Sequence, residues 1–258
     1  MLKMLKYEFR RHIGMILTAL GAIVASEAYA LISLYLKNEI HITTSLVTLF
    51  IVGASMMGLV FAFSIRIYER ELTSNEGLLT FMTPISVLKV LLGKFLATFL
   101  MGAVAAGLLA GAVVLNIAVA KKVFPEMGMY QEILDMVIQN MEIVETVSEF
   151  VAMIAAAAFV FLASYFSWIA IAYLATTLSS TWMRNKKGRW AVAFALFFAF
   201  SYLLSFVNSQ VGGMIAPEGS AVGYNWTPYY VAMGAISLVF IVLSVWGSTV
   251  LLKKYVDF

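Results

Sequence analysis

The chain has 258 residues, of which 62% are hydrophobic and 12% charged, and its mean hydropathy of +0.94 is too high for a water-soluble globular domain. A net charge of +3 at pH 7 is too small a surplus to indicate nucleic-acid binding. With no cysteine and only two histidines, the chain excludes a disulfide framework, a thiol nucleophile, an iron–sulfur cluster and a multi-histidine metal site of its own. The composition therefore predicts an integral membrane protein.

Six windows are long and apolar enough to cross a bilayer core of about 30 Å, which takes roughly 20 helical residues. In chain order they are 15–36, 46–67, 90–120, 150–182, 190–212 and 229–252. The third and fourth exceed one bilayer thickness, which predicts tilted helices or helices that extend beyond the headgroups. The predicted fold is a single all-α membrane domain with six transmembrane helices.

The basic residues are distributed unevenly between the two sides that six spans create. With both termini on one side, that side receives fourteen of the seventeen Lys and Arg. The other side receives Lys37, Lys121 and Lys122 together with eight of the fourteen Asp and Glu. Because cytoplasmic segments carry the excess of Lys and Arg, we expect a multi-pass protein of the cytoplasmic membrane with both termini in the cytoplasm.

Residues 1–14 have the pattern of an interfacial amphipathic helix. Apolar residues recur at helical spacing, and the basic residues that follow them round the helix are Lys3, Lys6 and Arg10. Two interpretations stay open. The segment is either a helix in the membrane plane that also contacts a cytoplasmic partner, or a basic flank that only orients the first span.

The connection between the second and third spans, residues 68–89, is predicted to be a cytoplasmic coupling loop. Ser74 or Asn75 can cap a short helix that Pro84 ends. Many charges beside exposed apolar residues are typical of a docking surface. The alternative is a self-contained loop that packs on its own spans. The candidate docking residues are Glu69, Arg70, Glu71, Glu76, Leu78, Leu79, Phe81 and Met82.

Two predicted external segments have patterns of their own. Residues 121–149 alternate an apolar and an acidic face, which predicts an amphipathic helix. It either rests on the outer ends of the spans, forms the extended, solvated start of the long fourth span, or receives or releases a cationic or amphipathic substrate. Residues 206–228 are rich in turn formers, among them Gly212, Gly213 and Pro217. They are predicted to form a surface loop or a re-entrant segment that dips back into the membrane.

No motif for nucleotide binding or hydrolysis is present. Gly93-Lys94 lacks the glycine that a P-loop requires five residues earlier, and neither H-E-x-x-H nor G-x-S-x-G occurs. The chain is therefore expected to carry no motor and no catalytic centre.

The candidate residues for a translocation path lie in the first and fifth spans. Glu27 is the one acidic residue well inside a span, where a charge is costly and usually functional. We expect it either to line a path or bind a proton or cation, or to serve as a hydrogen-bonded packing residue. The fifth span carries a small and polar face suited to another protomer or a conduit, with Ser201, Ser205 and Asn208 as path candidates.

The order of these parts resembles the membrane subunit of a type-2 ABC transporter, and the resemblance covers nearly the whole chain. The loop is similar to the coupling-helix region of that family. An acidic–basic run, a short helix, a T-P-[IV]-S motif and a G-K pair follow one another there, and stand here as Glu69-Arg70-Glu71, residues 77–82, Thr83-Pro84-Ile85-Ser86 and Gly93-Lys94.

The resemblance implies a permease that has no ATPase activity of its own. Two copies, or one copy and a paralogue, would pair around a central path in the bilayer. Each would dock on a separate ATPase subunit, which binds the ATP and magnesium, while this chain binds no cofactor, metal or nucleic acid. The implied roles in docking are polar contact for Glu69, Arg70, Glu71 and Glu76, groove filling for Leu78, Leu79 and Phe81, and support for Lys3, Lys6 and Arg10.

The resemblance extends to small permeases that export, or confer immunity to, antimicrobial and amphipathic peptides, of which the phenol-soluble-modulin exporters are one group. Apolar, aromatic and Met-rich spans fit an amphipathic or lipid-like substrate better than a sugar or a metal ion. Two other classes stay open. These are a secondary transporter or channel that runs without ATP, and a membrane-embedded assembly or sensor protein.

Overall fold

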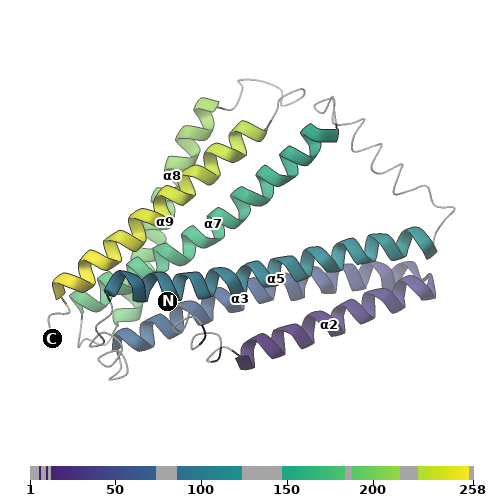
Figure 1. Cartoon of the computed structure of the whole chain (residues 1–258), viewed down its shortest axis with the longest axis horizontal. Coiled ribbons are helices and arrows are strands. Elements are labelled where there is room, and N and C mark those ends of the chain that lie inside the picture. Colours follow the sequence, from purple (N-terminus) through teal and green to yellow (C-terminus); the bar gives the residue numbers. More distant parts are fainter. Residues whose placement is uncertain are drawn as a thin grey trace. The chain divides into compact units, whose positions relative to one another are not determined.

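The described part of the chain is entirely helical. The structure is a computed structural model, and it describes residues 6, 10, 13–73, 86–123, 147–183, 188–215 and 226–255. Within these residues there is no strand, and Figure 1 shows the helices in the colours of the sequence. They are α2 (Ile13–Leu36), α3 (Glu39–Thr73), α5 (Val87–Val123), α7 (Val147–Trp182), α8 (Arg189–Ile215) and α9 (Thr227–Tyr255).

Each of these six helices is long and apolar enough to cross a membrane. This confirms the six predicted spans and identifies a multi-pass membrane protein. The helices leave bulky apolar side chains exposed, among them Phe50, Phe194 and Trp246. Such a surface is unfavourable in water and is accommodated by the acyl chains of lipids.

The turn between α2 and α3 is tighter than predicted. Lys37 adopts a positive φ of 52°, and its N–H donates to a carbonyl one turn back, which ends α2. The side-chain oxygen of Asn38 accepts hydrogen bonds from the N–H groups of Ile40 and His41, at 3.1 and 3.4 Å. With this cap α3 begins at Glu39, well before the predicted start of the second span.

The polar residues at the start of α3 fit a helix because their hydroxyl groups bond to carbonyl oxygens of the same helix. Thr44, Ser45 and Thr48 each donate to the carbonyl three or four residues earlier, at 2.8 Å. A hydroxyl satisfied in this way needs no external partner. The polar residues that set the start of the predicted second span therefore lie inside the helix.

α8 ends within the predicted external connection, residues 206–228. The helix continues to Ile215, so the predicted turn formers Gly212 and Gly213 lie inside it. A Cβ at Gly212 would lie 3.1 Å from the ring of Tyr229 on α9, so the glycine permits a close approach of the two helices. Residues 216–225 lie outside the described residues, and a re-entrant segment stays a prediction.

Three other predicted segments fall largely outside the described residues. Of the N-terminal segment 1–14, Lys6, Arg10 and the first residues of α2 are described, and Lys3 is not. Residues 124–146, most of the predicted external helix, are likewise outside. The coupling loop is undescribed over residues 74–85, which include Glu76, Leu78, Leu79, Phe81 and Met82. Their helices and contacts stay predictions.

The chain divides into two compact units. The first consists of residues 1–64 and 93–134, and its described helices are α2, most of α3 and most of α5. Two buried clusters join these helices, namely Ile23 with Met56 and Ala105, and Val60 with Ala97 and Met101. The hydroxyls of Ser64 and Thr98 lie 2.9 Å apart and join α3 to α5.

The second unit consists of residues 65–92 and 135–258, and α7 is its most buried helix. Most of its residues between 163 and 179 are buried, so α7 is covered nearly all round. It packs along α9, where the hydroxyls of Ser164 and Ser237 lie 3.4 Å apart and Gly234 faces the ring of Phe159. Small residues at such a seam let the two backbones approach closely.

Gly234 provides a test of this packing. A Cβ at this position would overlap the ring of Phe159, whereas a Cβ at Gly213 of α8 would meet nothing within 4 Å. Alanine favours a helix over glycine by about 1 kcal/mol at either site, but overpacking costs about 1–3 kcal/mol. We expect Gly234→Ala to lower the thermal unfolding temperature of the detergent-solubilised protein, and Gly213→Ala to maintain or raise it. An unchanged temperature for Gly234→Ala would contradict a tight seam between α7 and α9.

Candidate functional site

The C-terminal end of α3 is the root of the predicted coupling loop. α3 ends at Thr73, directly before residues 74–85. Its last turns belong to the second unit, together with α7 and α8. Consecutive residues of α3 contact each of these two helices, so the root of the loop is fixed to two further spans.

Tyr68 joins α3 to α7. Its side chain is 1% exposed, and its ring stacks on that of Tyr173, with centroids 4.3 Å apart. Its hydroxyl lies 2.6 Å from Thr177 Oγ1. The Thr177 hydroxyl already donates its single proton to the carbonyl of Tyr173, at 2.8 Å, so Tyr68 is the donor in the bond between the side chains. Residues four apart share a helix face, and one face of α7 thus holds both the ring and the hydroxyl of Tyr68.

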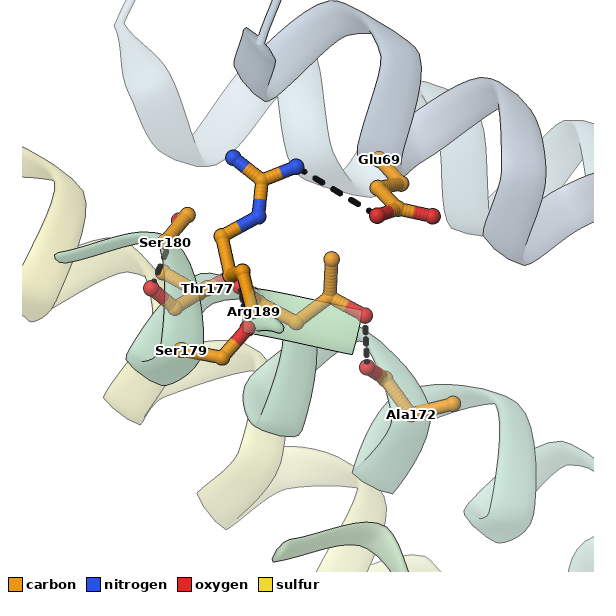
Figure 2. Close-up of polar contacts among 7 residues, drawn as sticks. Glu69, Ala172, Thr177, Ser179, Ser180 and Arg189 are labelled. Atoms are coloured by element: carbon orange, nitrogen blue, oxygen red, sulfur yellow. Dashed lines mark hydrogen bonds and ion pairs between the residues drawn. The ribbon is translucent and has the colours of Figure 1, made fainter. Parts of the chain in front are cut away.

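Glu69 joins α3 to α8. Arg189 Nη2 donates to Glu69 Oε1 at 3.3 Å, and Figure 2 shows the guanidinium extending toward α3 from the start of α8. The arginine side chain is 17% exposed and that of the glutamate 39%. Water therefore screens this pair, and its contribution to stability is at most about 1 kcal/mol. The role of this ion pair is positional, since it joins the first turn of α8 to the last turns of α3.

The end of α7 beside this contact is rich in hydroxyl groups. Figure 2 shows several of them bonding back along α7. Thr176 donates to the carbonyl of Ala172, Ser179 to that of Thr176, and Ser180 to that of Thr177, at 2.8, 3.0 and 2.8 Å. Since their protons are used by the backbone, we interpret this cluster as part of the helix packing.

The three residues of the acidic–basic run have different surroundings. Glu69 is in the ion pair with Arg189, Glu71 is 5% exposed, and Arg70 is exposed. Arg70 is therefore the residue of this run that a separate protein reaches most directly. Two basic residues of the N-terminal segment are also described, and both are exposed: Lys6 and Arg10.

A second candidate site lies in the first unit, where Glu27 of α2 meets Asn116 of α5. Asn116 Nδ2 lies 3.1 Å from Oε1 and 2.9 Å from Oε2 of Glu27, and it also donates to the carbonyl of Ala112 at 3.0 Å. Asn116 is 6% exposed and Glu27 is half-buried. Asn116 Oδ1 is buried and has no hydrogen-bond partner among the described residues.

The three path candidates of α8 do not share one environment. Ser201 and Asn208, seven residues apart, are half-buried on the side of the helix that includes the buried Leu204. Ser201 Oγ and Asn208 Oδ1 are buried and have no hydrogen-bond partner in the described part of the chain. Ser205 is exposed. The predicted polar face of the fifth span is thus divided between an inward and an outward side.

Sequence reasoning missed Asn116, Tyr68 and Thr177. A signal existed for Asn116, because an amide in an apolar span is costly unless it is hydrogen-bonded, and Glu27 was available as a partner. No comparable signal existed for Tyr68, since a tyrosine near the end of a span is ordinarily an interfacial residue. Which face of α3 meets α7 depends on packing that the sequence pattern does not encode locally.

The hydrogen bond between Tyr68 and Thr177 predicts an unequal effect of removing its two members. Tyr68→Phe removes the donor, and the Thr177 hydroxyl keeps its bond to the backbone. Thr177→Val leaves the Tyr68 hydroxyl buried without an acceptor, which costs about 1–3 kcal/mol, against about 1 kcal/mol for a bond that is lost cleanly. We expect Thr177→Val to lower the thermal unfolding temperature more than Tyr68→Phe, and the double variant to recover part of the loss.

Thermal unfolding followed by circular dichroism measures this difference. Ser180→Ala is the matched control, because that hydroxyl donates to a carbonyl within α7. Equal losses for Tyr68→Phe and Thr177→Val would contradict the assignment of Tyr68 as the donor.

Comparisons with known proteins identify no family for this chain. The chain matches no protein-family model, no curated protein and no solved structure. Among the described residues, no group of three or more His, Asp and Glu side chains is arranged to hold a metal ion. A functional assignment therefore rests on the contacts of the chain itself.

Proposed function

We propose that the chain is the membrane-spanning permease subunit of an ATP-driven exporter of the type-2 ABC class. It forms the translocation path with a second permease copy or a paralogue, and separate ATPase subunits drive it. The observation that carries this proposal is the attachment of the end of α3 to α7 and α8 through Tyr68 and Glu69. A force applied to residues 74–85 would pass through these contacts to three spans.

The proposed orientation places this attachment on the side where an ATPase is available. The distribution of Lys and Arg assigns both termini to the cytoplasm. On that assignment the end of α3, the end of α7 and the start of α8 are all cytoplasmic. The contacts of Tyr68 with Thr177 and of Glu69 with Arg189 support it, because each joins residues assigned to the same side.

The residues of the coupling loop divide into two roles in this proposal. Glu69 holds α3 to α8, while Arg70 and the apolar residues of 74–85 contact the ATPase. ATP and magnesium bind to the ATPase subunit, since this chain has no P-loop. The permease converts closure of the ATPase dimer into a movement of its spans.

The proposed substrate is an amphipathic or antimicrobial peptide or a lipid-like molecule. Apolar side chains make up most of the six spans. Apart from the carboxylates at the end of α3, Glu27 is the one carboxylate within them. This composition fits a substrate that partitions into the bilayer. An ATP-independent secondary transporter or channel is the alternative, and it would ordinarily need several ionisable groups at the midplane.

Co-expression with a candidate ATPase from a neighbouring reading frame tests the proposal. Purification through a tag on the permease is expected to recover a stoichiometric complex that hydrolyses ATP. Leu78→Asp with Leu79→Asp is expected to abolish recovery of the ATPase, because charged groups cannot fill an apolar groove without losing hydration. Insertion of the variant into the membrane should be unchanged, since both residues lie outside the spans.

Val137→Asp with Ile138→Asp is the matched control, with the same chemical change in the predicted external segment. This variant should recover the ATPase at the level of the unaltered chain. Normal recovery of the ATPase by the Leu78 and Leu79 variant would remove the docking role of the loop. Recovery of a folded permease alone, in every case, would favour the secondary transporter or channel.

A further inference from the structure

An ionised Glu27 has no balancing charge among its described neighbours. It lies well inside its span, eleven residues after Ile16 and nine before Leu36, where an ionised side chain is strongly unfavourable unless it is paired. Its hydrogen-bond partner is a single neutral nitrogen, Asn116 Nδ2, within 3.1 Å of both carboxylate oxygens. This donor orients the carboxylate but adds no positive charge.

The orientation of the Asn116 amide is determined by a second contact. The carbonyl of Ala112 can only accept a hydrogen bond, and it lies 3.0 Å from the same nitrogen. Nδ2 therefore faces both Glu27 and Ala112, and Oδ1 faces away from them. Because Asn116 is 6% exposed and Oδ1 has no described partner, a buried acceptor is left unsatisfied beside an uncompensated carboxylate.

The described groups of this unit that can carry a charge include a tyrosine–histidine pair and two lysines near helix ends. Tyr29 on α2 bonds to His41 on α3, with the hydroxyl 3.3 Å from Nδ1. Lys37 directly follows α2, and Lys122 lies in the last turn of α5. Among the described residues, the carboxylate thus has no cationic partner, and its half-exposed side is open to an added one.

A protonated amine suits the open side of Glu27, because it carries a positive charge and three N–H donors for the carboxylate oxygens. A metal ion fits less well, since calcium and magnesium take six or more oxygen ligands. Apolar side chains are exposed close to the pair along both helices, at Val24 on α2 and at Val113 and Ile117 on α5.

We propose that Glu27 and Asn116 form a binding site for the primary ammonium group of an amphipathic molecule, whose apolar part lies along α2 and α5. The proposal rests on the proposed function only for the substrate class, which it narrows to cationic amphiphiles. Glu27 supplies the charge and the acceptor oxygens, and Asn116 orients Glu27.

Three probes of equal chain length test the site on the full chain in phosphatidylcholine nanodiscs. Dodecylammonium has the charge and the donors, dodecyltrimethylammonium has the charge alone, and dodecanol has no charge. Radiolabelled probe bound to protein is measured against empty nanodiscs, which removes partitioning into lipid. We expect saturable binding of dodecylammonium, weaker binding of the trimethyl probe, and no saturable binding of dodecanol.

Variants separate the roles of the two residues. Glu27→Gln removes the charge at nearly constant volume and is expected to weaken dodecylammonium binding by about tenfold or more. Asn116→Leu removes the donor that orients Glu27 and is expected to weaken binding about three- to tenfold. Glu39→Gln makes the same chemical change at the first residue of α3 and should leave binding unchanged.

Unaltered affinity of Glu27→Gln for dodecylammonium would overturn the proposed site. This result holds whether or not the Asn116 variant folds. Equal binding of the ammonium and trimethyl probes would overturn the preference for a primary ammonium group, because it would show that hydrogen bonds to Glu27 add nothing to the charge. No ATPase is present in this measurement, so its result is independent of co-purification. If the chain binds the amine but does not associate with an ATPase, the binding site is supported and the proposed permease function is overturned. If it associates with the ATPase but does not bind the amine, only the binding site is overturned.

Discussion

A polar group inside a bilayer has no water to bond with, and this constraint decides which side chains join the helices of this chain. Most hydroxyls in the described spans satisfy it locally by donating to a carbonyl of their own helix, as Thr44, Thr48 and Thr176 do. Some of the groups that do not satisfy it locally make contacts between helices instead. Tyr68 reaches Thr177 on α7, and Glu27 reaches Asn116 on α5. Each of these contacts joins two helices at a defined position.

The number of spans was predictable because it depends on the length of apolar runs, and these lengths can be read directly from the sequence. The ends of the helices were less predictable, for the same reason that polar residues are tolerated inside them. Thr44 and Ser45 do not interrupt α3, since their hydroxyls are satisfied by it, and Gly212 does not interrupt α8, since Tyr229 packs against it. A polar or flexible residue delimits a span only where nothing nearby compensates for it.

The candidate site was predictable only in part. Glu27 stood out as a charge in an apolar run, whereas its partner is 89 residues away and depends on how α2 and α5 pack. Glu69 and Glu71 were predicted as docking residues from the charged loop and its resemblance to a coupling-helix region, which does not say which way each side chain faces. Residues two apart on a helix face different directions, and Glu69 pairs with Arg189 while Glu71 is buried. The transport function follows from resemblance and from these contacts, and it stays a proposal.

The turn at Lys37 and Asn38 has a consequence for how the protein enters the membrane. With α2 ending at Leu36 and α3 beginning at Glu39, the second crossing starts almost where the first one stops. Because only Lys37 and Asn38 separate the two helices, we expect α2 and α3 to enter the bilayer together as one hairpin during biogenesis.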